Sequence, residues 1–316
     1  MTGSLQPRRS EAGPARDVAL ARRIAAAHGL PVQPVVELTG RGSVNHVFVV
    51  GLPGERWVVR FAVDPLRTDE FATETWCLRL AAAAGIPSPV PVAAGVLDGV
   101  RYGVQGFVEH VGRDAVQARD LWETLGRAAR KINELPVAAD APAGLFSRFG
   151  RDLAAAWRAH LSYHLAQLTC EDRLPALGVY PLAEQPRLRE VVLALAETPM
   201  AFGLSHGDLA RRNVLVRPDG ALVLLDWGSA SCGPVPYTDL LTLHHHHEQE
   251  DDPSASDLAA FGRGYGLSPG AFEPTLAAMR QLAALDLVRW AAERRPDRLP
   301  EVVGWARDEL ARPHRG

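Results

Sequence analysis

Apolar residues change their spacing along the 316-residue chain, and the change predicts two kinds of structure. In the first part, short runs rich in Val and Phe are separated by Gly, Pro and Asp, which is typical of strands joined by turns. From residue 114 onward, apolar residues recur mostly at helical spacing. We expect strands at 35–38, 44–50, 56–61, 92–97 and 100–108, and helices at 17–27, 68–84, 121–135, 152–168, 187–197, 256–265, 274–294 and 300–310.

These elements favour an α+β fold with a small, β-rich N-terminal lobe and a larger, mainly helical C-terminal lobe. We assign the N-terminal lobe to residues 17–108 and the C-terminal lobe to 109–316. Residues 1–16 are polar and contain Pro and Gly, so we expect a disordered tail there.

Composition narrows the classes of function. The net charge of −3 does not indicate the basic face of a nucleic-acid-binding protein. No apolar run reaches the ~18 residues of a membrane-spanning helix. The three cysteines are widely separated, which argues against a disulfide framework. We therefore expect a cytoplasmic protein that binds neither nucleic acid nor membrane, as a monomer or a dimer.

Asp208, Asn213 and Asp226 form the most informative pattern. Asp208 and Asn213 share one tight loop, and Asp226 follows a predicted hairpin that turns at residues 218–220. Such a hairpin would bring Asp226 back beside Asn213. Two carboxylates and an amide at this spacing can hold Mg²⁺ and orient a hydroxyl for attack on a phosphate. We expect Asp208 to be the catalytic base and Asn213 and Asp226 to be the magnesium ligands.

A second pattern lies between the first predicted strands. Gly40 and Gly42 can bring backbone N–H groups close to phosphates, and Ser43 can add a hydroxyl donor. Lys131 is the only lysine among the 34 basic residues, so a cation on a phosphate should be an arginine.

Arg60 is our candidate for that cation, because it lies on the third predicted strand. We expect Glu74 on the following helix to hold Arg60 by a charge-assisted hydrogen bond. Glu70 lies one turn earlier on the same helix face and is the competitor.

The segments His206-Gly-Asp208, Asn213 and Asp226-Trp-Gly228 resemble the signatures of the aminoglycoside phosphotransferase (APH) family of small-molecule kinases. Weaker matches, among them Ile86-Pro87 and the segment 237–240, extend the resemblance over about residues 35–295. The chain departs from the family pattern at Asn133, where many members have histidine. Arg60 also replaces the commoner lysine.

The resemblance implies a bilobal, protein-kinase-like fold and a reaction that uses ATP or GTP with Mg²⁺. Val108 and His110 would lie at the lobe hinge, where the family binds adenine. The implied acceptor is a hydroxyl of a small molecule. An antibiotic (an aminoglycoside or another sugar-bearing or peptide compound) is the first expectation, and a choline-like, sugar-like or methylthioribose-like metabolite is the alternative.

Three other classes remain open. In a protein kinase, Arg212 would lie near the acceptor hydroxyl, although no Ala-Pro-Glu segment follows the magnesium loop. Gly203-x-Ser205-x-Gly207 fits the nucleophile motif of a serine hydrolase, which would require alternating strands and helices before Ser205. A nucleotide-binding pseudokinase would keep the fold without the turnover.

The run of four histidines at 244–247 is followed by Glu248, Glu250 and Asp251. Four consecutive histidines do not all face one way on a helix or a strand, so they do not predict a metal site. The acidic residues would favour a cationic acceptor, and we include Arg212, Glu248, Glu250 and Asp251 as candidate substrate-binding residues.

Overall fold

The computed structural model describes residues 14–38, 45–62, 70–111, 118–250, 252–268 and 270–312. The chain divides into two compact units. The N-terminal unit comprises Met1–Val111 and Arg217–Gly228, and the C-terminal unit comprises Gly112–Val216 and Ser229–Gly316. The loop that carries Asp226 thus belongs to the N-terminal unit. The expected lobe boundaries stay a prediction.

The N-terminal unit is built on a five-stranded antiparallel sheet of order β1-β2-β3-β5-β4. Gly and Asp turns join its central strands, as the sequence pattern predicts. The strands are β1 (Val35–Glu37), β2 (Asn45–Val50), β3 (Trp57–Ala62), β4 (Pro91–Leu97) and β5 (Val100–Gly106).

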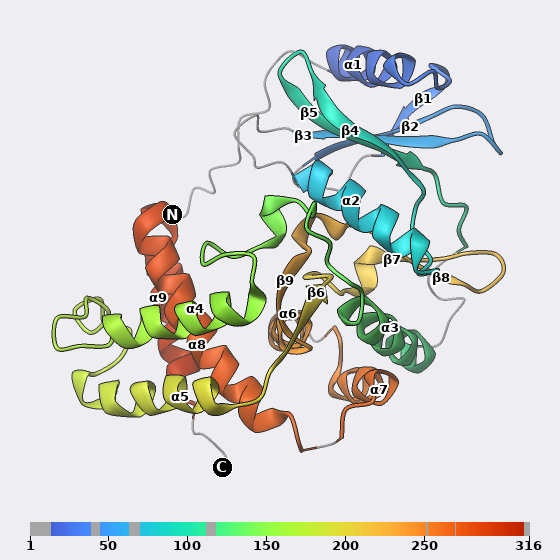
Figure 1. Cartoon of the computed structure of the whole chain (residues 1–316). Coiled ribbons are helices and arrows are strands. Elements are labelled where there is room, and N and C mark those ends of the chain that lie inside the picture. Colours follow the sequence, from blue (N-terminus) through green and yellow to red (C-terminus); the bar gives the residue numbers. More distant parts are fainter. Residues whose placement is uncertain are drawn as a thin grey trace. The chain divides into compact units, whose positions relative to one another are not determined.

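Two helices cover opposite faces of this sheet, α1 (Pro14–Ala27) and α2 (Glu70–Ala83) (Figure 1). Helix α1 buries Ile24 against Phe48 and Phe61, in the main core of this unit. Asp17 lies in the first turn of α1, so the helix begins three residues before the expected start at residue 17.

The side chains of β3 alternate between the two faces of the sheet, and this alternation directs Arg60 toward α2. Val59 and Phe61 are buried on the α1 side, so Arg60 between them points to the other face. Gly103 is opposite Arg60 on β5, and Phe71 of α2 fills the space over this glycine. The arginine and α2 therefore share one side of the sheet.

The C-terminal unit is mainly helical, as expected. The predicted helices are all present, with ends that differ by a few residues from the expected ones. They are α3 (Ala118–Asn133), α4 (Leu153–Gln167), α5 (Gln185–Glu197), α7 (Ala255–Tyr265), α8 (Glu273–Arg294) and α9 (Leu299–Leu310), with short 3₁₀ turns at Ala143–Leu145, Leu182–Glu184 and Pro296–Arg298.

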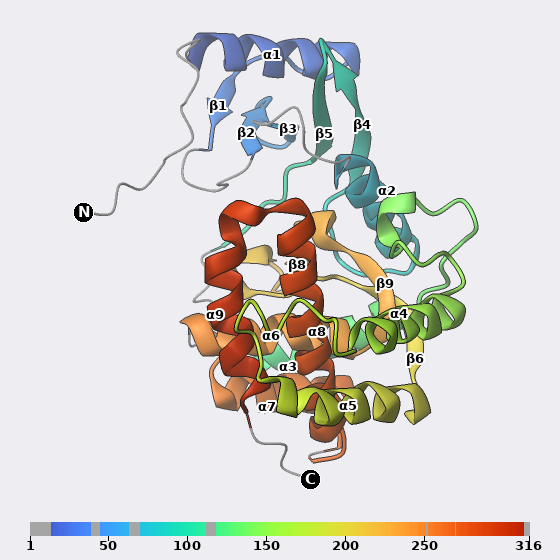
Figure 2. The same cartoon turned by 90° about the vertical axis from the view of Figure 1, so that its left-hand side faces the viewer.

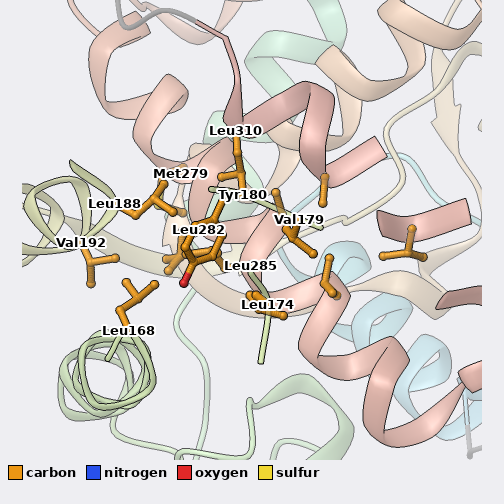
Figure 3. Close-up of a cluster of buried hydrophobic side chains, with 14 of the residues drawn as sticks. Leu168, Leu174, Val179, Tyr180, Leu188, Val192, Met279, Leu282, Leu285 and Leu310 are labelled. Atoms are coloured by element: carbon orange, nitrogen blue, oxygen red, sulfur yellow. The ribbon is translucent and has the colours of Figure 1, made fainter. Parts of the chain in front are cut away.

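Helices α4, α5, α8 and α9 surround the larger hydrophobic core. Leu168, Leu188, Leu282 and Leu310 are among its buried side chains (Figure 3). Helices α8 and α9 run side by side along this core (Figure 2). Burying this many aliphatic side chains supplies most of the stability expected of such a unit, because each fully buried Leu contributes about 1.5–3 kcal/mol.

Glycines allow α3 and α7 to pack closely. A Cβ on Gly126 would lie 2.1 Å from the carbonyl oxygen of Phe261, and one on Gly264 would lie 1.9 Å from that of Glu123. Neither position therefore tolerates a side chain. This contact holds the ends of the two helices, including Asn133 and Tyr265, beside strand β6.

Two strands and one helix of this unit were not predicted. Strand β6 (Ala201–Ser205) pairs with β9 (Ser231–Val235), and α6 (Tyr237–Glu250) carries the four histidines. Strand β9 contains Gly and Pro and exists because β6 offers it a partner. Helix α6 lacks a clear apolar stripe, which is why its sequence did not predict a helix.

Strands β7 (Val214–Val216) and β8 (Leu222–Leu224) flank the turn expected at residues 218–220. The turn is closed by a hydrogen bond from Arg217 N to Ala221 O (2.9 Å), and Gly220 has a positive φ of 83°. Among the described residues, no helix is long and apolar enough to cross a membrane.

Candidate active site

Asp208 and Asn213 lie on the loop that follows β6 in the C-terminal unit. The Asn213 amide donates from Nδ2 to the backbone carbonyl of Asp208 (2.9 Å) and to its Oδ2 atom (2.8 Å). A 3₁₀ turn, η4 (Arg211–Asn213), folds Asn213 back toward Asp208. Because Nδ2 is used in these bonds, the amide oxygen of Asn213 is the atom available to ligate a cation.

Gly207 gives this loop its shape. Its φ of +79° is a conformation that other L-residues rarely adopt. A Cβ at this position would lie 2.1 Å from the carbonyl oxygen of Ser229. An arginine before the aspartate, as in protein kinases, would not fit here.

Helix α6 supports the loop with one face. Asp239, Thr242 and His246 follow the i, i+3, i+7 spacing of a helix face. Asp239 Oδ1 accepts from Gly207 N (2.8 Å), and Thr242 Oγ1 donates to Gly207 O (3.3 Å). His246 Nε2 lies 3.8 Å from Asp208 Oδ1. This support was missed by the sequence analysis, because α6 has no clear apolar stripe and the three side chains that face the loop are polar.

The Asp239 carboxyl is fully buried. Burial raises the pKa of Asp239 to about 6, although hydrogen bonds from the backbone of Gly207 and His206 oppose the shift. Ionising Asp239 in this position therefore costs free energy. The loop is supported by the hydrogen bonds that the buried carboxyl accepts from the backbone.

Asn133 holds strand β6 from the other side. Its Nδ2 donates to Leu204 O (2.8 Å), and its Oδ1 accepts from the Tyr265 hydroxyl (2.7 Å). An asparagine thus fills the position where the family often has histidine, with both ends of its amide hydrogen-bonded.

Arg212, a predicted substrate-binding residue, hydrogen-bonds Asp208, the residue predicted to be the base. Its Nη2 donates to Asp208 Oδ1 (2.7 Å) and lies 3.4 Å from His246 Nε2. Burial lowers the pKa of His246, and the nearby Arg212 charge lowers it further. A neutral His246 can accept from Arg212, so the two side chains and Asn213 together orient the Asp208 carboxylate.

Arg60 and Glu74 form a buried ion pair in the N-terminal unit. Arg60 Nη1 donates to Glu74 Oε1 at 2.7 Å, and their side chains are 13% and 5% exposed. Glu70 instead accepts from Asn45 Nδ2 (2.9 Å). Burial raises the pKa of the Glu74 carboxyl, and the Arg60 guanidinium opposes that shift. The geometry therefore distinguishes the two carboxylates that the sequence left as competitors.

Asp226 is the second acidic partner of Arg60. Its Oδ1 lies 3.5 Å from Arg60 Nη2, and its side chain is half exposed. Burial acts to lower the pKa of Arg60, but the charges of Glu74 and Asp226 outweigh it and raise that pKa overall. Asp226 also has a positive φ of 60°, a strained conformation for a residue other than glycine, and such strain often occurs at functional sites.

The other predicted residues fall into two groups. His110 Nδ1 donates to Val108 O (3.0 Å) in an exposed segment after β5. Gly40, Gly42, Ser43 and Asp251 lie outside the described residues. The convergence of Asp226 with Asp208 and Asn213 around one cation stays a prediction.

Glu248 differs from the expectation of a free acidic residue. It accepts from Arg280 Nη2 (2.6 Å) and from Arg312 Nη2 (3.1 Å). Burial acts to raise the pKa of Glu248, but these guanidinium groups lower it overall. Its charge is therefore neutralised by arginines. Glu250 ends helix α6.

Ser205 does not have the setting of a hydrolase nucleophile. Its side chain is fully buried at the end of β6. The described residues between 118 and 200 form helices and loops instead of alternating strands. The serine-hydrolase interpretation is therefore wrong.

A cavity of about 1150 Å³ lies among α6, α8 and α9 in the C-terminal unit. Thr242 forms part of its wall and donates a hydrogen bond to the carbonyl of Gly207, so the cavity reaches the support of the loop that carries Asp208 and Asn213. Trp290 and Trp305 offer aromatic surface. The charged wall residues are five acids and five arginines: Glu248, Asp286, Glu293, Glu301, Asp308, Arg148, Arg280, Arg289, Arg294 and Arg298.

Solved structures with the same fold include several small-molecule kinases. Macrolide 2'-phosphotransferase MphH from Brachybacterium faecium is 21% identical, with a TM-score of 0.57 over 95% of this chain and 100% of that one. Spectinomycin phosphotransferase APH(9)-Ia, in complex with ADP and spectinomycin, is 14% identical, with a TM-score of 0.55 over 98% and 96%. Choline kinase LicA from Streptococcus pneumoniae is 16% identical, with a TM-score of 0.56 over 94% and 99%.

No curated protein is significantly similar in sequence. The model of the family "APH: Phosphotransferase enzyme family" matches residues 35–285, most of the chain. That span includes the loop of Asp208 and Asn213, the ion pair of Arg60 and the segment of Asp226. The chain therefore belongs to the APH family of phosphotransferase enzymes.

Proposed function

We propose that the protein transfers the γ-phosphate of ATP or GTP to a hydroxyl of a small molecule, with Asp208 as the catalytic base. The observation that carries this proposal is the hydrogen bonding of Asp208 by Asn213 and Arg212. These donors fix the orientation of the Asp208 side chain, and a carboxylate in this position can accept the proton of an attacking hydroxyl. General-base catalysis of this kind is worth about 10²- to 10⁴-fold in rate.

Asn213 and Asp226 would hold Mg²⁺. Their donor atoms fit this ion, because Mg²⁺ prefers oxygen ligands, few protein carboxylates and substrate phosphates. The Asn213 amide has its nitrogen bonded to Asp208, which leaves its oxygen as the ligand. When bound, the ion would neutralise the charge of the phosphates.

Arg60 would contact the phosphates of the nucleotide. Glu74 and Asp226 hold its guanidinium in place, and a guanidinium has five N–H donors, so it can bridge protein carboxylates and an anionic ligand. Gly40, Gly42 and Ser43 would supply further donors, and the backbone near Val108 and His110 would bind the base. Both nucleotides are abundant in the cytoplasm, where we expect the enzyme to act.

The cavity beside Thr242 is our candidate for the acceptor pocket. Its balanced wall charges and two tryptophans favour a hydroxylated acceptor with an apolar surface over a polycation. Because arginines neutralise Glu248, the structure gives less support to a cationic acceptor than the acidic sequence alone. An antibiotic of this character, such as a macrolide, is the first candidate and would make the enzyme a resistance factor. A primary metabolite is the second.

The test is a screen of hydroxylated acceptors with the purified full-length protein, Mg²⁺, and ATP and GTP in parallel. Macrolides, aminoglycosides, peptide antibiotics, choline and sugars should be included. Product formation is measured by mass spectrometry as the gain of one phosphoryl group. We expect a product with at least one neutral or singly charged acceptor, formed at least about 100-fold more slowly by Asp208→Asn. Exclusive activity on polycationic aminoglycosides would overturn the acceptor assignment, and nucleotide binding without any turnover would favour a pseudokinase.

A further inference from the structure

Two histidines of α4 and one aspartate of α8 converge in the C-terminal unit, and none of them has a role in the proton transfer or phosphate binding proposed above. His160 Nε2 lies 2.9 Å from Asp286 Oδ1 and 2.8 Å from Oδ2. His164 Nε2 lies 2.8 Å from Asp286 Oδ1. The candidate ligand atoms of all three residues lie within 4.8 Å of one another.

The helix spacing and the packing explain this convergence. His160 and His164 are four residues apart, so both rings project from the same face of α4. The ring of Phe149 stacks on His160 with centroids 5.2 Å apart, and that of Tyr163 packs edge-on against His164 at 5.2 Å. His164 is fully buried and His160 is 19% exposed. The imidazoles are therefore held in place by neighbours other than Asp286.

Among the described residues, the two histidines hydrogen-bond the Asp286 carboxylate, and Arg148 interacts with it through its charge without forming an ion pair. Within the part of the chain that the structure describes, Asp286 forms no ion pair with an arginine or lysine. In the same described residues, no other group of three His, Cys, Asp or Glu side chains has this geometry. The four consecutive histidines of α6 in particular do not form one.

We propose that His160, His164 and Asp286 bind a Zn²⁺ ion that ties α4 to α8. Two imidazole nitrogens and one carboxylate oxygen are a typical three-residue zinc set, with bonds of about 2.0–2.2 Å. Ligands at those lengths around a tetrahedral ion stand about 3.3 Å apart. Each histidine–aspartate distance, now 2.8 Å, must therefore lengthen by about half an ångström, which a small rotation of the partly exposed Asp286 supplies.

The fourth ligand position would face open space. Asp286 lines the cavity of about 1150 Å³ and also a second one of about 330 Å³, which His160 lines as well. A water molecule can complete the coordination from there. Each imidazole would move its proton from Nε2 to Nδ1, so no proton need leave a neutral histidine.

The affinity of this site for Zn²⁺ should be moderate. Zinc-bound histidines usually donate their second N–H to a carboxylate or carbonyl, and such partners are worth about 10- to 100-fold in affinity. His164 Nδ1 is buried without a hydrogen-bond partner among the described residues. Titrations should therefore extend to about 100 µM Zn²⁺ to detect a site that lacks this support.

The experiment uses the full-length protein, free of any affinity tag and treated with a chelator. Zn²⁺ binding is measured by calorimetry, and Co²⁺ serves as the spectroscopic probe because tetrahedral Co²⁺ absorbs strongly in the visible region. We expect one equivalent of either ion. Asp286→Asn and His160→Gln should each weaken binding by at least about 100-fold, more than the loss of an outer-shell partner. The matched control is His245→Gln/His247→Gln, which should bind as the unchanged protein does.

The absence of binding up to about 100 µM would overturn the proposal, as would binding that persists in Asp286→Asn and His160→Gln or disappears in the α6 control. Circular dichroism of the metal-free variants shows whether each is folded. Should Asp286→Asn fail to fold, His160→Gln decides the question, because its side chain is partly exposed. None of these readouts depends on phosphoryl transfer, so failure of this site and failure of the proposed function are distinguishable.

Discussion

The carboxylate of Asp239 accepts a 2.8 Å hydrogen bond from the backbone N–H of Gly207, the residue before the proposed base. One buried side chain at the start of α6 thus supports the turn that positions Asp208. Its replacement tests both the geometry of the loop and the cost of burying a charge.

Asp239→Asn should change how stability depends on pH. The pKa of Asp239 is raised by burial to about 6 in the folded protein, against about 3.9 when unfolded. Between these values the folded state binds more protons, so the free energy of unfolding falls as pH rises from about 4 to about 6. The loss is up to about 3 kcal/mol, and the asparagine variant should lack it. Urea unfolding from pH 4 to 7 measures the difference. A constant difference between the two proteins across this range would contradict the prediction.

Asp208→Asn should lower kcat by about 10²- to 10⁴-fold, because the amide cannot take the proton of the acceptor hydroxyl. The KM for the nucleotide should change little, since nucleotide binding is assigned to other residues. Steady-state kinetics with the acceptor found in the screen give both values. Near-normal turnover would remove Asp208 as the base.

Asp226→Asn should raise the Mg²⁺ concentration needed for half-maximal rate and lower kcat by at least about 10²-fold, the usual cost of losing one electrostatic contact to the transition state. Initial rates across a Mg²⁺ series measure both effects. Asp219→Asn, on the exposed turn of the same segment, is the matched control and should behave as the unchanged enzyme. Equal Mg²⁺ dependence in all three proteins would exclude Asp226 as a ligand.

Arg60→Met should destabilise the protein by about 3–5 kcal/mol, because Glu74 is left buried without its partner. Arg60→Met combined with Glu74→Leu should recover part of this loss, since the pair then becomes apolar. Chemical unfolding of the single and double variants gives the coupling energy. Arg23 and Asp98 form an exposed pair in the same unit, so Arg23→Met should cost less than about 1 kcal/mol. Additive losses for Arg60 and Glu74 would show that they are not coupled.

Local patterns determined much of the fold. Strands β2 to β5 and helices α3, α4 and α8 were predictable because each shows its own spacing of apolar residues. The Gly, Pro and Asp residues that end these elements are also close to them in sequence. The same holds for the pattern of Asp208, Asn213 and Asp226, whose chemistry depends on residue types at short spacing.

Tertiary packing decided which residues distant in sequence become partners, which spacing along the chain could not. Glu70 and Glu74 lie on one face of α2, and only the rotation of that helix against β3 brings Glu74 to Arg60. Strand β9 forms because β6, distant in sequence, offers it hydrogen-bond partners.

The sequence alone thus determined the class of chemistry and the family, since both are carried by contiguous motifs. The support of Gly207 by α6 and the meeting of His160 and His164 with Asp286 required the folded chain. The physical reason is the separation along the chain of the residues that interact. A motif records neighbours along the backbone, whereas side chains of different helices meet only where the hydrophobic core fixes how those helices pack.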